Sequence, residues 1–349
     1  MPTLAAITDV VILGLIIFGV LNVLLITASA LVYAERRVAA FMQERTGPDR
    51  VGPKGLLQPF ADVGKLILKE DIVPAQANRF LHGLAPTLMV VVAMSTAAVI
   101  PWARGLVIAD VGVGILVVLA LTSLSVYGVT LAGWASNSKY ALLGGLRSSA
   151  QMISYELSMG AAVISVVLMA GTLSMTGIVE DQAGGFGLGW NFWRNPVAFV
   201  IFTVCAFAET NRAPFDLPEA EQELVGGYHT EYTGMKFGMF FLAEYVAMFV
   251  ASLVIVTLFL GGYLLPLEPL FAGWFVENGL NWLLIILQLI GFVLKVGAVC
   301  FLFIWVRWTL PRFKYNQLMT LGWKILLPIS IANILVIAVG VILYRSLIG

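Results

Sequence analysis

The chain has 349 residues, of which 60% are hydrophobic and 11% are charged, and its mean hydropathy is +0.95. Soluble domains have about a quarter charged residues, so this composition excludes a soluble enzyme and indicates an integral membrane protein. The formal net charge of zero gives no sign of nucleic-acid binding. The two cysteines lie inside apolar runs and there are only two histidines, so neither a disulfide framework nor a metal site is indicated.

Eight apolar runs follow one another along the chain, and each is close to the roughly 20 residues that a transmembrane helix needs. We therefore predict an all-α integral membrane protein in which residues 1–349 form a single membrane domain. The fifth run is unusual, because the helix after Pro196 would rise only about 20 Å. Either this helix starts near Trp190 or Glu209 is drawn into the membrane. The predicted spans are approximately residues 9–33, 82–100, 111–132, 150–170, 190–209, 237–262, 281–306 and 325–345.

The lysines and arginines orient this bundle, because positively charged loops stay in the cytoplasm. Sixteen of the twenty lie in the connections after the first, third, fifth and seventh runs or at the adjoining helix ends. The opposite side holds Arg104, Arg194 and Arg345, and Lys295 falls inside the seventh run. Both termini are therefore predicted to lie on the non-cytoplasmic side. The N-terminus lacks the basic flank of a cleaved signal peptide, so the first run is expected to remain as a span.

The first cytoplasmic connection contains a second helical pattern, at approximately residues 55–69. Apolar residues such as Phe60 recur there at helical spacing, while Asp62 and Lys65 take the other face. About 15 residues are too few to span a bilayer, so this amphipathic helix is predicted to lie along the membrane surface or to cover a cavity between spans. The preceding segment GPDRVGPKG (47–55) is basic and rich in turn residues, which favours a fixed irregular path suited to a soluble partner.

Acidic residues are concentrated in and beside the predicted membrane region. Seven of the twenty lie within residues 209–244, mostly in the cytoplasmic connection 210–236, and Glu156 lies inside the fourth span. Charged groups at a bilayer are costly unless they contact water, partners or protons. Prolines and apolar side chains interleave with the acids of the connection, so we expect it to be ordered and partly buried. With Glu35 and Lys295, these acids are candidates for a polar path from the cytoplasmic face to the membrane centre.

Three segments resemble one protein family. They are ERRVAAFMQERTGPDRVGPKGLLQPFADVGKLILKED (35–71), SSAQMISYELSMG (148–160) and AETNRAPFDLPEAEQELVGGYHTEYTGMKFGMFFLAEY (208–245). These segments, together with eight spans and outward termini, are similar to the NuoH family. Its members in bacteria and mitochondria form a membrane subunit of respiratory complex I, the proton-pumping NADH:quinone oxidoreductase.

The resemblance implies a subunit of this enzyme that has no independent activity when isolated. It implies quinone as the substrate and no cofactor bound by this chain, with the iron–sulfur clusters and FMN in partner subunits. The implied partners are the hydrophilic quinone-site and iron–sulfur subunits, the small membrane subunits that lead to the antiporter-like subunits, and the lipid bilayer. The implied location is the bacterial plasma (inner) membrane or, alternatively, the mitochondrial inner membrane.

The resemblance also implies a narrow chamber that admits quinone from the bilayer, and a charged route from that chamber toward the membrane interior. Basic and aromatic side chains suit such a chamber, because it must pass an isoprenoid tail and stabilise transient negative charge on the headgroup. No residue of the chain is expected to be catalytic in the redox sense or to bind a metal. The chamber candidates are Glu35, Arg36, Arg37, Phe41, Arg45, Phe60, Asp62 and Lys65. The proton-coupling candidates are Glu156, Glu209, Asp216, Glu219, Glu221, Glu223, Glu231, Glu244 and Lys295.

Three other functions remain open from the residues alone. A self-contained proton-coupled transporter also places acids in a helical bundle, but it predicts inverted repeats and broken helices around a midplane site, and the sequence indicates neither. A structural membrane anchor explains the charged connections as docking contacts but leaves Glu156, Glu244 and Lys295 without a role. A membrane subunit of a related energy-converting hydrogenase differs from the favoured function only in the identity of its partners.

Overall fold

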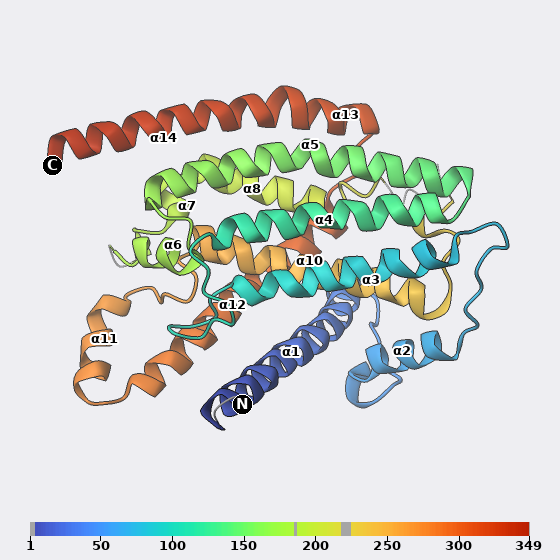
Figure 1. Ribbon diagram of the computed structural model, residues 1–349, viewed down its shortest axis with the longest axis horizontal. Helices are drawn as coiled ribbons and strands as arrows, with labels where there is room; N and C mark the ends of the chain where they lie inside the picture. Colours follow the sequence, from blue (N-terminus) through green and yellow to red (C-terminus); the bar gives the residue numbers. More distant parts are fainter. Residues whose placement is uncertain (1–3, 185–186, 218–224, 349) are drawn as a thin grey trace.

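The computed structural model describes residues 4–184, 187–217 and 225–348 (Figure 1). Within these ranges seven helices are long and apolar enough to cross a membrane, which confirms the predicted all-α membrane class. The described α-helices are α1 (Leu4–Met42), α2 (Gln58–Leu68), α3 (Arg79–Thr96), α4 (Gly114–Ala135), α5 (Lys139–Ala170), α6 (Met175–Asp181), α7 (Asn191–Arg194), α8 (Pro196–Glu209), α10 (Gly234–Phe259), α11 (Glu268–Glu277), α12 (Asn281–Thr309), α13 (Tyr315–Thr320) and α14 (Leu327–Ile348).

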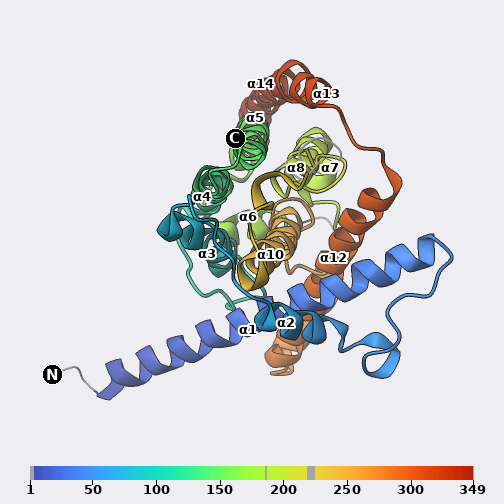
Figure 2. The ribbon, with the colours of Figure 1, turned by 90° about the vertical axis from the view of Figure 1, so that its right-hand side faces the viewer.

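The helices α3, α4, α5 and α14 lie side by side in a curved row, and α8 and α10 lie inside the curve (Figure 2). The helix α10 is the centre of the packing, because it contacts α1, α3, α8 and α12. Of its most apolar 18-residue stretch 67% is buried, against 11% for α1 and 17% for the span that α13 and α14 form together. The polar side chains of α10 therefore meet other protein groups, whereas α1 and α14 present their apolar side chains outward.

The fifth predicted span is divided into the short helices α7 and α8. Asn195 separates them with a non-helical backbone, and its side chain accepts a hydrogen bond from the N–H of Ala198 at 3.1 Å. Pro196 then occupies the first turn of α8, where its fixed φ angle suits a helix start. The 14 residues of α8 rise about 21 Å. This helix is therefore shorter than the seven long helices and ends at Glu209, inside the bundle.

The connection after α8 folds back onto the bundle. Gln151 of α5 holds it there, because the side-chain amide donates to the backbone carbonyls of Ala208 and Phe215 at 2.8 Å each. The backbone N–H of Phe313, between α12 and α13, donates to the carbonyl of Pro214 at 3.1 Å. The connection is thus held by α5 and by the segment between α12 and α13.

The helix α2 lies outside the row of long helices and packs against α1 and α10 (Figures 1 and 2). A glycine permits its close approach to α10, because a Cβ at Gly238 would lie 2.8 Å from Cδ1 of Leu66. Pro59 at the start of α2 is buried, whereas Phe60 is 62% exposed. One face of α2 therefore contacts the bundle and encloses a pocket against α1 and α10.

Candidate functional site

Four charged side chains from distant parts of the sequence meet at one end of the bundle. Nη1 of Arg212 donates to Glu35 at 3.0 Å, and its Nε lies 2.9 Å from Oε1 of Glu244. Nη1 of Arg307 donates to the other oxygen of Glu35 at 2.6 Å and lies 3.7 Å from Oε1 of Glu244. We refer to Glu35, Arg212, Glu244 and Arg307 as the ion cluster. Its two carboxylates and two guanidinium groups balance in charge.

Arg212 is the most enclosed member of the ion cluster. Only 1% of its surface is exposed, and its guanidinium carbon lies 4.6 Å from the centre of the Tyr245 ring. Burial alone lowers the pKa of Arg212, but the carboxylates of Glu244 and Glu35 outweigh burial, so the pKa is raised above its ordinary value. The guanidinium stays charged and neutralises two carboxylates that are costly to bury alone.

A second acid–arginine pair lies beside the ion cluster. Nη2 of Arg312 donates to Asp216 at 2.8 Å. Burial raises the pKa of Asp216 to about 6, although the nearby Arg312 and Arg307 lower it. Burial dominates because Asp216 is 9% exposed while the side chain of Arg312 is 41% exposed, where solvent screens its charge. The pKa of Asp216 is therefore higher than that of a solvent-exposed aspartate, in spite of its arginine partner.

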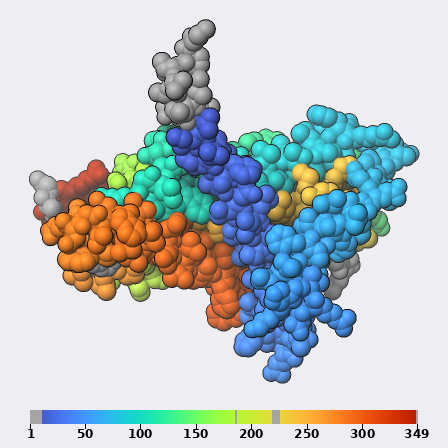
Figure 3. Space-filling view, turned by 90° about the horizontal axis from the view of Figure 1, so that it is seen from below, coloured from blue at the N-terminus to red at the C-terminus, as the bar shows by residue number. Residues whose placement is uncertain are grey.

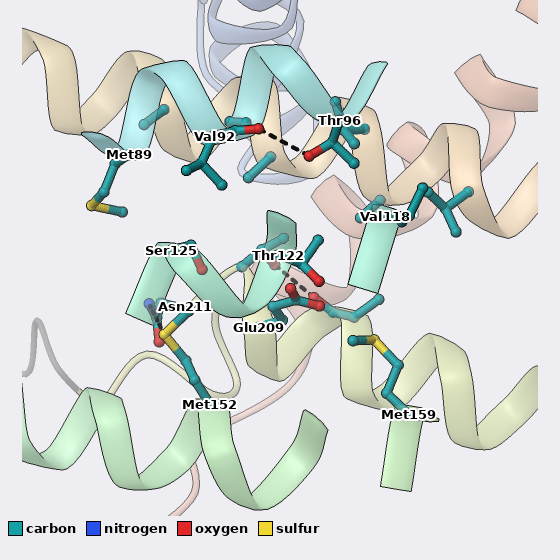
Figure 4. A pocket seen from close by; sticks show the side chains of 18 of the residues that line it. Met89, Val92, Thr96, Val118, Thr122, Ser125, Met152, Met159, Glu209 and Asn211 are labelled. Atoms are coloured by element: carbon teal, nitrogen blue, oxygen red, sulfur yellow. Dashed lines mark hydrogen bonds between the residues drawn. The ribbon is translucent and has the colours of Figure 1, made fainter. Parts of the chain in front are cut away.

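A cavity of about 950 Å³, which includes space open to solvent, lies between α3, α4, α5, α8 and α10. Glu244 of the ion cluster lines this cavity, and so do Asn211 and Glu209. Figure 4 shows Glu209 directed toward Thr122, with methionine side chains on the walls. Most of the remaining lining is apolar, so these few polar groups are the places where water or a proton is best stabilised.

Glu156 of α5 lies in a smaller recess that it shares with Glu209 and Thr122. The hydroxyl of Ser123, from α4, donates to the carboxylate of Glu156. Two acids from different helices therefore face one enclosed space. Glu244 and Glu209 share the larger cavity, and Glu209 and Glu156 share the smaller recess. The three acids Glu244, Glu209 and Glu156 therefore form a spatial series that leads from the ion cluster into the interior.

A separate pocket lies between α1, α2 and α10, and Tyr245 is one of its lining residues. Its walls combine apolar residues such as Val32 and Phe241 with the charged residues of the two outer helices. Nη1 of Arg36 lies 2.6 Å from Oδ2 of Asp62, and Nζ of Lys65 lies 4.0 Å from Oδ1 of the same residue. The pocket can hold an apolar chain and still place cations near a polar headgroup.

The structure does not bring the eight predicted chamber residues together at one place. Their settings are the α1/α2/α10 pocket (Arg36, Asp62, Lys65), the ion cluster (Glu35), a second recess beside α1 (Arg37, Phe41, Arg45) and an exposed position on α2 (Phe60). The division follows from helix geometry, because successive residues of a helix point about 100° apart.

The predicted coupling residues are also divided. Glu156, Glu209 and Glu244 are brought together by the cavity and the recess, and Asp216 lies beside the ion cluster. Glu231 is half-buried in the turn before α10, away from this series of acids. The predicted residues Glu219, Glu221 and Glu223 lie outside the described residues.

Lys295 lies at the opposite end of α10. Its Nζ donates to the backbone carbonyls of Leu260, Gly262 and Leu264 at 2.7, 3.0 and 2.5 Å. Nζ also lies 4.2 Å from the centre of the Trp190 ring. Leu260 is 16 residues beyond Glu244, or about 24 Å along a helix. Lys295 is therefore engaged by backbone groups and is not placed among the coupling acids.

From the sequence, Arg212, Arg307 and Arg312 are only part of the cytoplasmic charge excess, whereas the structure makes them partners of buried acids. For one of these arginines the sequence did indicate an acidic partner. Arg307 lies near the end of a span, where a cation is costly unless an acid balances it. The sequence gave no indication that Thr122 and Ser123 lie beside the acids, because hydroxyl side chains inside spans commonly form hydrogen bonds within their own helix.

Comparisons with known proteins agree over nearly the whole chain. Residues 15–338 match the family described as NADH dehydrogenase. The NADH-quinone oxidoreductase subunit 8 of Rhodothermus marinus is 66% identical over 332 residues, which cover 95% of this chain and 97% of the relative. An NADH-quinone oxidoreductase subunit of Salinibacter ruber is 66% identical over 330 residues, which cover 94% and 96%. An NADH-quinone oxidoreductase subunit of Rickettsia canadensis is 47% identical over 339 residues, which cover 96% and 95%.

Proposed function

Because the chain belongs to the NADH dehydrogenase family, it is a membrane subunit of NADH-quinone oxidoreductase, and we propose that it admits quinone and couples quinone reduction to proton pumping. In this proposal partner subunits contain the FMN and the iron–sulfur clusters. Hydrophilic quinone-site subunits cover the ion-cluster end, and small membrane subunits connect the chain to antiporter-like subunits. The bacterial relatives favour a location in the bacterial plasma membrane.

We further propose eight spans, in which α7 and α8 together form the fifth, with both termini on the non-cytoplasmic side. The ion-cluster end then faces the cytoplasm. The excess of basic residues in the corresponding connections supports this orientation. The short helix α8 supports the proposed number of eight spans, because it is apolar and packs among the long helices.

The α1/α2/α10 pocket suits the entrance of quinone from the bilayer. Its apolar walls match an isoprenoid tail, and it lies beside α1, of which only a small share is buried. Arg36 and Lys65 line the pocket and are positioned to donate hydrogen bonds to the carbonyl oxygens of the headgroup as it passes. Asp62 holds both cations in place by its ion pairs.

The single observation that supports coupling is the position of Tyr245 and Glu244, which are neighbours on α10. Tyr245 lines the quinone pocket, and its ring lies against the guanidinium of Arg212. Glu244 pairs with the same guanidinium and lines the cavity that leads to Glu209. Arg212 therefore contacts one lining residue of each space, Tyr245 and Glu244, and a charge in the pocket acts on the acids of the cavity through this side chain.

The expected electrostatic effect is large enough to move a proton. Two unit charges 4 Å apart interact by about 4 kcal/mol at an effective dielectric constant of about 20. A change of about 1.4 kcal/mol shifts a proton equilibrium tenfold. Negative charge near Tyr245 attracts Arg212 and Arg307 and so weakens their hold on Glu244. Glu244 then takes up a proton, and exchange with Glu209 and Glu156 carries the change inward.

The test uses the intact particle, purified in mild detergent from its native membrane. Co-purification with iron–sulfur and antiporter-like subunits, together with quinone-dependent NADH oxidation, is expected. Arg36→Glu should raise the apparent KM for quinone at least fivefold, because it replaces a donor to the headgroup oxygens with a carboxylate that repels those oxygens and Asp62. Lys324→Glu reverses an exposed charge elsewhere and serves as the matched control. A chain that purifies alone and transports a solute, or an Arg36→Glu enzyme with the parent KM, contradicts the proposal.

A further inference from the structure

A long apolar groove separates α1 from α12 on the side of α1 that faces away from the quinone pocket. The two helices are seen beside each other in Figure 3, α1 in blue and α12 in orange. On α1, Ala34 and Val38 line the groove, whereas Val32 and Arg36 line the quinone pocket. Two residues of a helix turn it by about 200°, so the groove and the pocket lie on opposite faces.

The groove is shaped for hydrocarbon. The residues that line it include Leu31 of α1, Phe249 of α10 and Phe292 of α12, and none of its lining residues is charged. It extends along α1 from Val23 to Val38, which corresponds to about 22 Å of helix. One leaflet is about half of the roughly 30 Å hydrocarbon core, so the groove is long enough to hold an acyl chain that extends through the leaflet.

The groove opens into a basic recess at the end of α1. Val38 and Phe301 line both spaces, which makes the recess continuous with the groove. The recess contains two cations and one acid, Arg37, Arg45 and Asp49. Nη1 of Arg37 donates to a backbone carbonyl at 3.3 Å, and Nε of Arg45 donates to a neighbouring glutamine at 2.7 Å. These contacts orient the guanidinium groups and use one nitrogen of each, out of the five N–H donors that a guanidinium has.

We propose that this groove and recess together bind one anionic diacyl phospholipid of the cytoplasmic leaflet. The acyl chains lie between α1 and α12, and Arg37 and Arg45 bind the phosphate. The assignment rests on the proposed cytoplasmic position of this end of α1. Basic pockets between membrane helices on that side are typical sites for anionic headgroups. The two cations and one acid of the recess leave a net positive charge, which complements an anionic phosphate.

The experiment places the purified complex in nanodiscs with a photoreactive phospholipid. The probes are phosphatidylglycerol and phosphatidylcholine that each have a diazirine on one acyl chain. Mass spectrometry then compares labelling of the groove peptides of α1 and α12 with labelling of α14, whose apolar side chains also face outward. The parent chain should show about fivefold more labelling of the groove by phosphatidylglycerol than by phosphatidylcholine, and equal labelling of α14 by both.

Two variants test the tail and the headgroup separately. Gly297→Leu fills the groove, because a Cβ at Gly297 meets no atom within 4 Å, and should lower groove labelling by both probes. Gly340→Leu, on α14, has equally open space and should change nothing in the groove. The double substitution Arg37→Gln with Arg45→Gln should lower phosphatidylglycerol labelling to the phosphatidylcholine level. Labelling of α14 by both probes and the amount of assembled complex should remain at the parent values.

The proposal fails under three results. Equal labelling by the two probes in the parent removes the headgroup preference. Retained phosphatidylglycerol preference in the Arg37→Gln, Arg45→Gln variant removes the role of the recess. A groove that no lipid probe labels, and that a photoreactive residue at position 297 cross-links to a neighbouring subunit, shows a protein interface instead. None of these outcomes depends on quinone kinetics, so the lipid site and the quinone route are tested independently.

Discussion

The two ends of α10 hold buried charge in different ways. At one end, Glu244 pairs with Arg212 and approaches Arg307, and both arginines also pair with Glu35. At the other end, Lys295 donates to three backbone carbonyls beyond the last turn of α10. At the Glu244 end, the same charged groups can pair in more than one way. At the Lys295 end, the ammonium group is stabilised by the dipoles of backbone carbonyls.

This difference indicates which buried charge can respond to a signal. Lys295 is held by three carbonyls of the connection that follows α10, and a backbone carbonyl has no charge or proton to exchange. Carboxylates and guanidinium groups on four separate segments can exchange partners with small side-chain movements. The ion cluster also adjoins a cavity through Glu244. We therefore assign coupling to the ion cluster and a structural role to Lys295.

The largest expected effect comes from removing the cation that the acids share. Arg212→Met leaves Glu244 without its nearest partner in a buried site, which costs about 3–5 kcal/mol. The amount of assembled complex in membranes should fall at least fivefold, as measured by native gel electrophoresis. The double variant Arg212→Met, Glu244→Gln removes the unpaired acid and should recover assembly but not proton pumping. Normal assembly and stability of the single variant would contradict the assigned pairing.

A smaller effect is expected from the acid beside the cluster. Burial raises the pKa of Asp216 to about 6, above the ordinary value of 3.8. Between about pH 4 and 6 the folded protein therefore retains a proton that the unfolded chain has lost. The contribution of Asp216 to stability falls as pH rises through this window and is constant above it. Asp216→Asn should flatten the dependence of thermal inactivation on pH from 4.5 to 6.5, and an unchanged slope argues against the shift.

The smallest effect is expected at the other end of α10. Lys295→Met leaves three carbonyls without their donor, which costs about 1–3 kcal/mol, so the complex should lose a few degrees of Tm. The number of protons pumped per electron should stay at the parent value. Lys295→Arg keeps donors in place and serves as the control. Loss of pumping with normal Tm would return Lys295 to the coupling route that the sequence analysis predicts.

The sequence was sufficient to predict the membrane class. It was also sufficient to identify acids that need partners, because a carboxylate inside an apolar run is easily recognised. It did not predict which partners those acids have. Arg212 and Glu35 are 177 residues apart, and Arg307 and Glu35 are 272 residues apart. No periodicity within a single helix reports such pairs, since they depend on how α1, α10 and α12 pack.

Two neighbouring arginines also show that the sequence does not predict which residues meet in space. Arg36 and Arg37 belong to one motif in the sequence, but the structure places them in different pockets. The resemblance to the NuoH family implied that both belong to the quinone chamber, because both lie in one segment that matches the family. The face that each occupies depends on the approach of α2 on one side and α12 on the other. In contrast, the short fifth run was noticed from Pro196 alone, because proline limits where a helix begins.

The most direct test of the central claim compares the two ends of α10 in one assay. Complexes with Glu244→Gln and Lys295→Met are reconstituted in proteoliposomes, and quinone-linked NADH oxidation and proton uptake are measured together. We predict that the Glu244→Gln complex assembles but loses most of its quinone-linked proton pumping, while the Lys295→Met complex keeps the parent ratio of protons to electrons. Normal turnover and pumping in an assembled Glu244→Gln complex would contradict the role of the ion cluster in coupling.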